Sequence, residues 1–177
     1  MTRTIGASLC VLLAGLAACA PVSQEIRREA EASAPFAEIQ KGPDKFKGSV
    51  VVWGGVIIET VNRQDATSIR VMQTALDFQK RPADLDRSEG RFIIVVDRFL
   101  DPDLFKKGRE VTVGGEIVGR ETHPIGEVRY VYPVVRAREL KLWEQRVPYP
   151  PTYYDPWYWG PSYPWRPWGP WGRPYGW

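Results

Sequence analysis

From Phe46 onward, hydrophobic and polar positions alternate with a period of two, and β-branched residues are frequent. This pattern is typical of β-strands with one buried face. It predicts five strands, which span Gly48–Val61, Thr67–Asp77, Gly90–Asp97, Arg109–Arg120 and Val128–Trp143. Between the third and fourth strands, Asp101 as a cap, Pro102 at the first helical position and Gly108 as a stop predict one or two helical turns.

The order of these elements predicts an all-β fold, a small five-stranded OB-like Greek-key barrel with one short helix. Gly54-Gly55 lies in the middle of the long first strand, where paired glycines indicate a bulge or a sharp bend. Gly114-Gly115 repeats the pattern in the fourth strand, as expected for two bent strands that cross at barrel corners. Pro133 indicates an edge position or a bulge in the last strand. An open β-sandwich is the alternative.

The first 18 residues are predicted to be a secretion signal, with a positive charge at Arg3 followed by an apolar run. The run from Ile5 to Ala18 is too short to span roughly 30 Å of hydrocarbon, for which about 20 apolar residues are usual. A cleaved signal therefore fits better than a transmembrane helix.

Leu16-Ala17-Ala18-Cys19 resembles the bacterial lipobox, with Leu at −3, small residues at −2 and −1, and Cys at +1. The resemblance implies cleavage between Ala18 and Cys19, a diacylglycerol on the Cys19 thiol and a third acyl chain on its new amine. Cys10 leaves with the signal, so Cys19 is the one cysteine of the mature 159 residues (177 − 18), and no intramolecular disulfide can form. Two or more acyl chains anchor a protein stably. Because position +2 is Ala20 rather than Asp, the Gram-negative sorting rule favours the outer membrane.

Residues 19–45 are predicted to be a lipidated tether. Gln24–Ala34 is polar and compatible with a helix, with Ser23 as a possible N-cap, but it has too few apolar positions for a packed face. Pro35 and Gly42-Pro43 interrupt it. We therefore expect a spacer between the lipid and the β-barrel domain of residues 46–146.

Residues 147–177 form a low-complexity tail. Residues 148–177 hold six of the eight tryptophans, six of the eight tyrosines and nine of the sixteen prolines. So many prolines disfavour helix and sheet, and polyproline II segments with turns are expected. Three interpretations remain open: a tail without a ligand, contact with the lipid interface, and binding of glycan or protein by the aromatic rings.

The composition gives little sign of catalysis. Net charge is +3, or +2 without Arg3, so no polyanion and no nucleic acid is expected as a partner. The single histidine, His123, falls in a predicted loop, Glu121–Glu127, and with no free cysteine in the mature chain a zinc site rich in nitrogen or sulfur is excluded. No nucleophile motif accompanies it, and neither glycine pair has phosphate-loop spacing. We expect no catalytic, metal or cofactor site.

Two aspartate pairs are the remaining candidates for chemistry. Asp84 with Asp86, and Asp101 with Asp103, have the residue types for acid and base catalysis or for a hard cation. In the simpler interpretation Asp101 caps a turn and the others face water near basic neighbours. A hydrolase that uses these pairs is the weakest hypothesis.

Several short motifs, taken together, resemble the Slp-type family, the starvation-inducible outer-membrane lipoproteins of Gram-negative bacteria. Besides the lipobox at Cys19, the motifs are Trp53-Gly54-Gly55, Arg81-Pro82, Ser88-x-Gly90-Arg91-Phe92, Phe99-Leu100-Asp101-Pro102, Lys107-Gly108-Arg109 with Val111-Thr112-Val113-x-Gly115, Ile125-Gly126-Glu127 with Tyr130-x-Tyr132-Pro133, and Leu142-Trp143. The resemblance covers about Cys19 to Trp143 and leaves the tail outside. It implies an outer-membrane lipoprotein facing the periplasm, but no reaction and no functional residue beyond Cys19.

We therefore expect a lipid-anchored outer-membrane lipoprotein with a non-enzymatic structural or stress-related role in the envelope. Its expected partners are outer-membrane lipid and, as candidates, peptidoglycan or an envelope protein. The expected covalent groups are the diacylglycerol and N-acyl chain on Cys19, with no other cofactor. The alternative is a glycan- or peptidoglycan-binding module that stacks sugars on the aromatic tail.

Overall fold

The structure is a computed structural model that describes residues 22–146. The predicted signal, the acylation site at Cys19 and the tail from residue 147 lie outside the described residues. The chain divides into two units, residues 1–145 and 146–177, and the fold described below belongs to the first.

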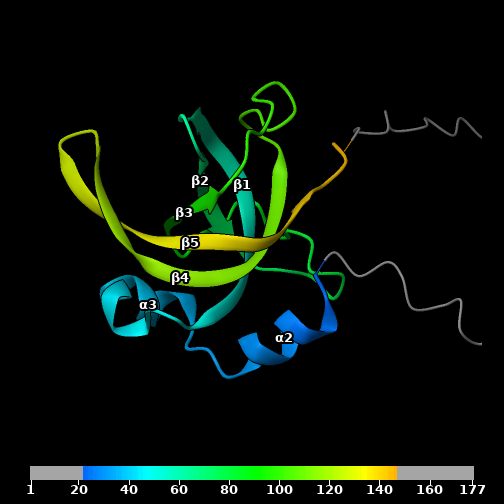
Figure 1. Ribbon diagram of the computed structural model, residues 1–177, viewed down its shortest axis with the longest axis vertical. Coiled ribbons are helices and arrows are strands. Elements are labelled where there is room, and N and C mark those ends of the chain that lie inside the picture. Colours follow the sequence, from blue (N-terminus) through cyan, green and yellow to red (C-terminus); the bar gives the residue numbers. More distant parts are fainter. Residues whose placement is uncertain (1–21, 147–177) are drawn as a thin grey trace, which may run out of the picture. The chain divides into compact units, whose positions relative to one another are not determined.

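Five strands form a closed barrel in the order β1-β2-β3-β5-β4 (Figure 1). They are β1 (Val50–Asn62), β2 (Thr67–Thr74), β3 (Arg91–Val96), β4 (Glu110–Ile125) and β5 (Val128–Leu142). The β3–β5 pair is parallel and the other neighbouring pairs are antiparallel. The five-stranded OB-like barrel predicted from the alternation is thereby confirmed, and the open sandwich is excluded.

The bend in β1 lies at the glycine pair, as predicted. Val50–Val56 pairs with β4 and Gly54–Asn62 pairs with β2, so the two ladders overlap at Gly54–Val56. A Cβ atom on Gly55 would overlap the carbonyl oxygen of Met72. Glycine is therefore needed for close backbone approach at this corner. The bulge of β1 lies further along, between Ile57 and Glu59, whereas β4 changes register at Gly114/Gly115 itself.

Inward-facing side chains fill the barrel as the period-two pattern predicts. Ile69 and Val71 of β2 are fully buried, as are Val111, Val113 and Ile117 of β4. The aromatic part of the core is a cluster in which the Trp53 and Phe92 rings meet edge to face, with centroids 5.3 Å apart. Such geometry adds roughly 0.5–1.5 kcal/mol to the burial of the rings.

The segment expected to be a spacer is instead packed on the barrel. It forms α2 (Gln24–Glu31), α3 (Phe36–Lys41) and the 3₁₀ helix η2 (Pro43–Phe46). Phe36 and Ile39 of α3 are 5% and 0% exposed and belong to the barrel core. The Phe36 ring meets Trp53 edge to face at 4.8 Å. The spacer expectation was wrong because a few apolar side chains are enough to anchor short helices: Ile26 in residues 24–34, and Phe36 and Ile39 after it, are buried.

The connection between β3 and β4 forms hydrogen-bonded turns where a short helix was expected. The Asp101 carbonyl accepts hydrogen bonds from the amides of Leu104 and Phe105, and its carboxylate accepts one from the Asp103 amide at 2.8 Å. The capping role predicted for Asp101 is therefore present. Leu100, 6% exposed, covers the barrel end opposite α3 and donates its amide to the Thr67 hydroxyl at 3.0 Å.

The hairpin between β4 and β5 is longer than predicted. β4 continues to Ile125, so most of the predicted loop Glu121–Glu127 is strand, and Gly126 turns the chain with φ +58°. Positive φ favours glycine at this tight turn. Pro133 pairs with Arg120, beside the second register shift of β4, which agrees with the bulge predicted there.

Candidate functional site

His123 lies in strand β4, not in a loop, and its contacts are structural. Its Nε2 is 2.7 Å from Glu121 Oε2, and its ring packs edge to face on Tyr132 with centroids 5.8 Å apart. Both partners come from the same hairpin. The imidazole therefore stabilises the β4–β5 ribbon.

The structure does not bring the two aspartate pairs together. Asp84 and Asp86 are exposed before β3, and Asp101 and Asp103 are exposed after it, so the pairs lie at opposite ends of that strand. Asp84 Oδ2 is 3.6 Å from Arg87 Nε. Within residues 22–146 no three His, Cys, Asp or Glu side chains are grouped to hold a metal ion. The hydrolase hypothesis thus loses its geometric basis.

Helix α2 is seated on the outer face of β1, where Val22 and Ile26 cluster with Val50, and of the neighbouring β4. Ser23 begins the helix, as predicted, and its hydroxyl accepts a hydrogen bond from the Ile26 amide at 3.4 Å. Val22 and Ile26 are 1% and 5% exposed and occupy the space above Gly114, where a Cβ atom would lie 2.9 and 2.8 Å from them. The Ser23 amide also donates to the Glu139 carboxylate at 2.7 Å. The start of α2 is therefore fixed by packing and by a charge-assisted hydrogen bond.

An ion-pair bridge holds the far part of α2. Arg138 of β5 donates to the Glu29 carboxylate at 2.9 Å and to Glu116 at 3.4 Å. The hydrogen bond to Glu29 is the main cause that raises the pKa of Arg138 above its ordinary value; with the charge of Glu29 and the hydrogen bond and charge of Glu116, it outweighs the opposing desolvation. All three side chains are well exposed, so the bridge orients the helix more than it stabilises the fold.

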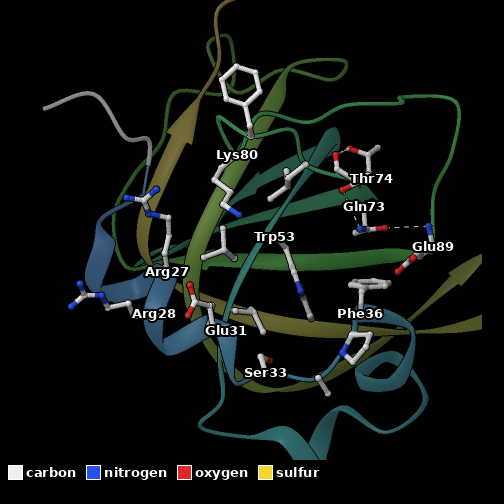
Figure 2. A pocket seen from close by; sticks show the side chains of 18 of the residues that line it. Arg27, Arg28, Glu31, Ser33, Phe36, Trp53, Gln73, Thr74, Lys80 and Glu89 are labelled. Carbon is white, nitrogen blue, oxygen red and sulfur yellow. Dashed lines mark hydrogen bonds between the residues drawn. The ribbon is translucent and has the colours of Figure 1, made fainter. Parts of the chain in front are cut away.

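A pocket of about 820 Å³ opens between α2, the start of β1 and the loop after β2 (Figure 2). Phe36 and Trp53 give it an apolar floor, and Gln73 and Thr74 give it a polar wall. Gln73 is held from both sides, because its Nε2 donates to the Thr74 carbonyl at 3.0 Å and its Oε1 accepts from the Glu89 amide at 3.1 Å. Figure 2 shows Arg27 and Lys80 toward one side of this pocket and Gln73, Thr74 and Glu89 toward the other.

A polar cluster fixes the loop after β2 beside α2. Arg81 Nε is 2.6 Å from Glu110 Oε2, and its guanidinium lies over the Trp143 ring at 5.4 Å. The Trp143 indole donates to the Thr112 hydroxyl at 2.9 Å, which donates to the Lys80 carbonyl at 2.6 Å. The Glu110 side chain is 9% exposed, and such desolvated, paired groups hold their geometry strongly once formed.

Alternation along β4 places these two attachments next to each other. Thr112 holds the loop through Lys80, and Gly114 receives Val22 and Ile26. Residues two apart in a strand share a face and lie about 6.6 Å apart. The amino-terminal end of α2 and the loop of residues 75–90 are therefore neighbours on the outside of the barrel.

Motif residues from distant parts of the chain meet in this structure. Arg81 contacts Trp143, and the Arg91 amide donates to the Tyr130 hydroxyl at 2.9 Å. The Gln40 side chain of α3 also donates to that hydroxyl. Hydrophobic periodicity gave no sign of these contacts or of the positions of Arg27 and Lys80, because it reports which face is buried and not which polar groups meet. The motif residues thus fix the packing of the loops and the helices on the barrel.

Among residues 22–146 no helix has the length and apolar character needed to cross a bilayer.

The chain is similar to a family of envelope lipoproteins. The sequence profile described as the Outer membrane lipoprotein Slp family matches residues 16–172. The match begins at the first residue of the Leu16–Cys19 motif and continues past Trp143, where the resemblance was expected to end. It therefore includes most of the aromatic tail, which we had placed outside.

Three curated relatives agree with this match. The uncharacterized lipoprotein YeaY of Escherichia coli K12 is 33% identical over 124 residues, which are 69% of this chain and 64% of YeaY. An uncharacterized protein of Haemophilus influenzae is 30% identical over 130 residues, or 73% of this chain and 70% of the relative. The outer membrane protein Slp of E. coli K12 is 28% identical over 148 residues, or 82% and 78%. The match thus spans just under two thirds of YeaY.

Solved structures with similar folds are more distant. A small single-stranded DNA-binding protein of Streptomyces coelicolor has a TM-score of 0.35 at 16% identity and covers 54% of this chain and 94% of its own. Pot1pC of Schizosaccharomyces pombe, solved with single-stranded DNA, has a TM-score of 0.28 at 11% identity, covering 58% and 83%. These values are too low for an inference about ligands.

Proposed function

The chain belongs to the Slp family of outer membrane lipoproteins, and on this premise we propose that acyl chains on Cys19 anchor it to the outer membrane, on the periplasmic side. There it has a non-enzymatic structural or stress-related role in the envelope. The protein is held by its lipid, and the barrel presents a rigid surface to envelope partners.

The observation that carries this proposal is the lipobox-like motif at the point where the family match begins. Leu16 is both the first matched residue and position −3 of Leu-Ala-Ala-Cys. The thiol of Cys19 is the nucleophile that acylation needs, and no other cysteine follows in the chain. The non-enzymatic role is supported by a barrel interior filled with packed side chains and by the separation of the acidic pairs.

The test compares two cysteine substitutions. Cys19→Ala should release the protein from the membrane fraction into the soluble periplasmic fraction and remove the lipid mass from the amino terminus. Cys10→Ala is the matched control, because Cys10 lies in the predicted signal, and it should leave both the fractionation and the lipid mass unchanged. Lipid mass on the Cys19→Ala chain, or none on the wild-type chain, would contradict the anchor.

The envelope role has its own readout. Cells that lack the protein should lose outer-membrane integrity under stress, measured as leakage of a periplasmic enzyme or entry of a dye. Wild-type protein should restore it, and Cys19→Ala should not, because a released barrel no longer lies at the membrane. Full rescue by Cys19→Ala would show that the role does not depend on the anchor.

A second candidate is a glycan- or peptidoglycan-binding module that uses the tail. It is supported by the six tryptophans and six tyrosines of residues 148–177 and by the extension of the family match to residue 172. Aromatic rings offer flat apolar faces on which sugars stack. Deletion of residues 148–177 should abolish co-sedimentation with isolated peptidoglycan. Equal sedimentation of both forms, or none of either, would exclude stacking by the tail.

A further inference from the structure

The folded domain begins almost at the proposed anchor. Val22 is 1% exposed and packs above Gly114 on the barrel wall, and only Ala20 and Pro21 separate it from Cys19. Three extended residues reach at most about 11 Å. An acylated Cys19 therefore keeps the surface around Val22 within about 11 Å of the lipid, and a barrel so held cannot turn an arbitrary side toward the membrane.

The surface beside Val22 carries an exposed phenylalanine. Phe78 is 88% exposed and lies at the rim of the pocket that Gln24 and Arg28 of α2 also line. Its loop is fixed to β4 through the Lys80 carbonyl and Thr112, two residues from Gly114, on which Val22 is seated. A large apolar ring, held on a braced loop next to an acyl anchor, is in the right place to enter a lipid interface.

Basic side chains line the same pocket as Phe78. They are Arg27, Arg28 and Lys80, and Glu31 and Glu89 line it with them. Neither Arg28 nor Lys80 takes part in an ion pair among the described residues. Cations close to an anionic lipid surface each contribute about 1 kcal/mol to binding. Arg28 and Lys80 complement lipid phosphates, and the two carboxylates reduce the net attraction, so the ring carries a large share of it.

We propose that this end of the barrel lies on the membrane, with Phe78 inserted at the lipid interface and Arg28 and Lys80 beside lipid phosphates. The proposal rests on the acylation of Cys19 put forward above. It gives the lipoprotein a fixed orientation, in which the barrel end covered by Leu100 points away from the bilayer.

The chain offers a matched control at that far end. Phe99 is 73% exposed, and Lys106 and Lys107, in the same connection between β3 and β4, are exposed as well. Leu100 bonds to Thr67 at the start of β2, whereas Phe78 follows the end of β2 at Thr74. The eight residues of this strand separate the two ends by about 23 Å. Exposure alone therefore does not distinguish Phe78 from Phe99, but the short link to Cys19 does.

The first experiment measures depth in the lipidated protein. Phe78→Cys and Phe99→Cys chains are labelled with a fluorophore, which the acylated Cys19 cannot accept because its sulfur is a thioether. They are reconstituted into phosphatidylethanolamine vesicles that contain some phosphatidylglycerol and a nitroxide lipid quencher. The probe at position 78 should be quenched several-fold more strongly than the probe at position 99. Equal quenching at the two positions would overturn the proposal.

The second experiment removes the lipid anchor and measures how strongly the protein surface alone binds vesicles. In a Cys19→Ala background, the triple variant Phe78→Ser, Arg28→Gln, Lys80→Gln is compared with Phe99→Ser, Lys106→Gln, Lys107→Gln, which loses the same ring and the same charge. The first should weaken binding to the same vesicles, without quencher, about tenfold or more, and the second should leave it unchanged. Equal loss in both variants, or no loss in the first, would overturn the proposal.

Thermal unfolding of both triple variants checks that each remains folded. The two proposals fail in different ways. If mass spectrometry finds no lipid on Cys19, the anchor is wrong, and the vesicle comparison still reports on the surface. If Cys19 is acylated and positions 78 and 99 behave alike, the anchor holds and the orientation is wrong.

Discussion

The two ends of the barrel are closed in different ways. At one end α3 places Phe36 and Ile39 into the core, where they join Trp53 and Phe92. At the other end the turns after β3 place Leu100 over the opening, while Phe99 remains exposed. The first closure comes from a segment that precedes the barrel in sequence, and the second from a connection between two of its strands.

This difference shows that the amino-terminal segment belongs to the folded domain. A spacer could be lengthened, shortened or removed without effect on the barrel, whereas a plug cannot. Because the packed part of this segment begins at Val22, three residues after Cys19, and continues to the plug in α3, the anchoring and the folding of this protein share one segment.

The largest expected effect follows from removing that segment. Deletion of residues 20–42 from the Cys19→Ala protein takes away the buried side chains of Val22, Ile26, Phe36 and Ile39. Each is worth about 1.5–3 kcal/mol of burial, and the sum approaches the whole stability of a typical domain, about 5–15 kcal/mol. We expect no cooperative unfolding transition in urea. A barrel that unfolds with unchanged midpoint and slope would restore the spacer interpretation.

A single substitution at the plugged end should also be large. Phe36→Ala removes two edge-to-face contacts and leaves a cavity beside Trp53, which should lower the free energy of unfolding by about 3–5 kcal/mol. Phe99→Ala, at a position 73% exposed, should change it by less than about 0.5 kcal/mol. Urea denaturation followed by circular dichroism measures both. Similar losses for the two variants would contradict the assigned roles.

The strands were predictable because a barrel wall has one solvent-exposed and one buried face. The alternation of hydrophobic and polar residues through Val111, Val113 and Ile117, which are all buried, follows from this. Helix α3 was not predictable, since six residues with apolar side chains at Phe36 and Ile39 are too few for helical periodicity to emerge. Pro35 and Gly42, which the pattern marks as interruptions, delimit this helix. The hydrophobic pattern therefore predicts elements in which buried positions recur, such as strands, but not a short helix that buries only two large side chains.

The packing site of α2 could not be predicted from the sequence for a different reason. The helix offers Ile26 as its buried residue, and the space it occupies exists because Gly114 has no side chain. Neither the sequence around Ile26 nor the sequence around Gly114 shows, by itself, that the two residues fit together. The same holds for the candidate membrane surface, since Phe78, Arg28 and Lys80 come together through a loop whose position depends on Thr112.

At the barrel end covered by Leu100, hydrogen bonds help to hold the closure in place, whereas aromatic packing holds α3 at the other end. Thr67 is fully buried, and its hydroxyl accepts from the Leu100 amide at 3.0 Å and lies 2.8 Å from the Arg98 carbonyl. Thr67→Val keeps the shape and leaves the amide without its partner, which should cost about 1–3 kcal/mol. Thr122→Val on the exposed edge of β4 is the control and should be near neutral. Urea denaturation midpoints that shift equally would show that this hydroxyl does not secure the closure.

The smallest expected effect tests whether α2 depends on its cap or on its seat. Ser23→Ala removes the hydroxyl that accepts from Ile26 at 3.4 Å but keeps the amide bond to Glu139. N-cap losses are typically about 1 kcal/mol, and this long hydrogen bond places the expected loss at about 0.5 kcal/mol. Ser33→Ala is the matched control, because the buried Ser33 hydroxyl has no hydrogen-bond partner among the described residues and its removal should be neutral or slightly stabilising. Thermal unfolding resolves the sign of each change. A Ser23→Ala loss well above 1 kcal/mol would mean that the cap, and not the packing of Val22 and Ile26 over Gly114, holds α2 on the barrel, and the rigid link between anchor and barrel would then depend on a single hydroxyl.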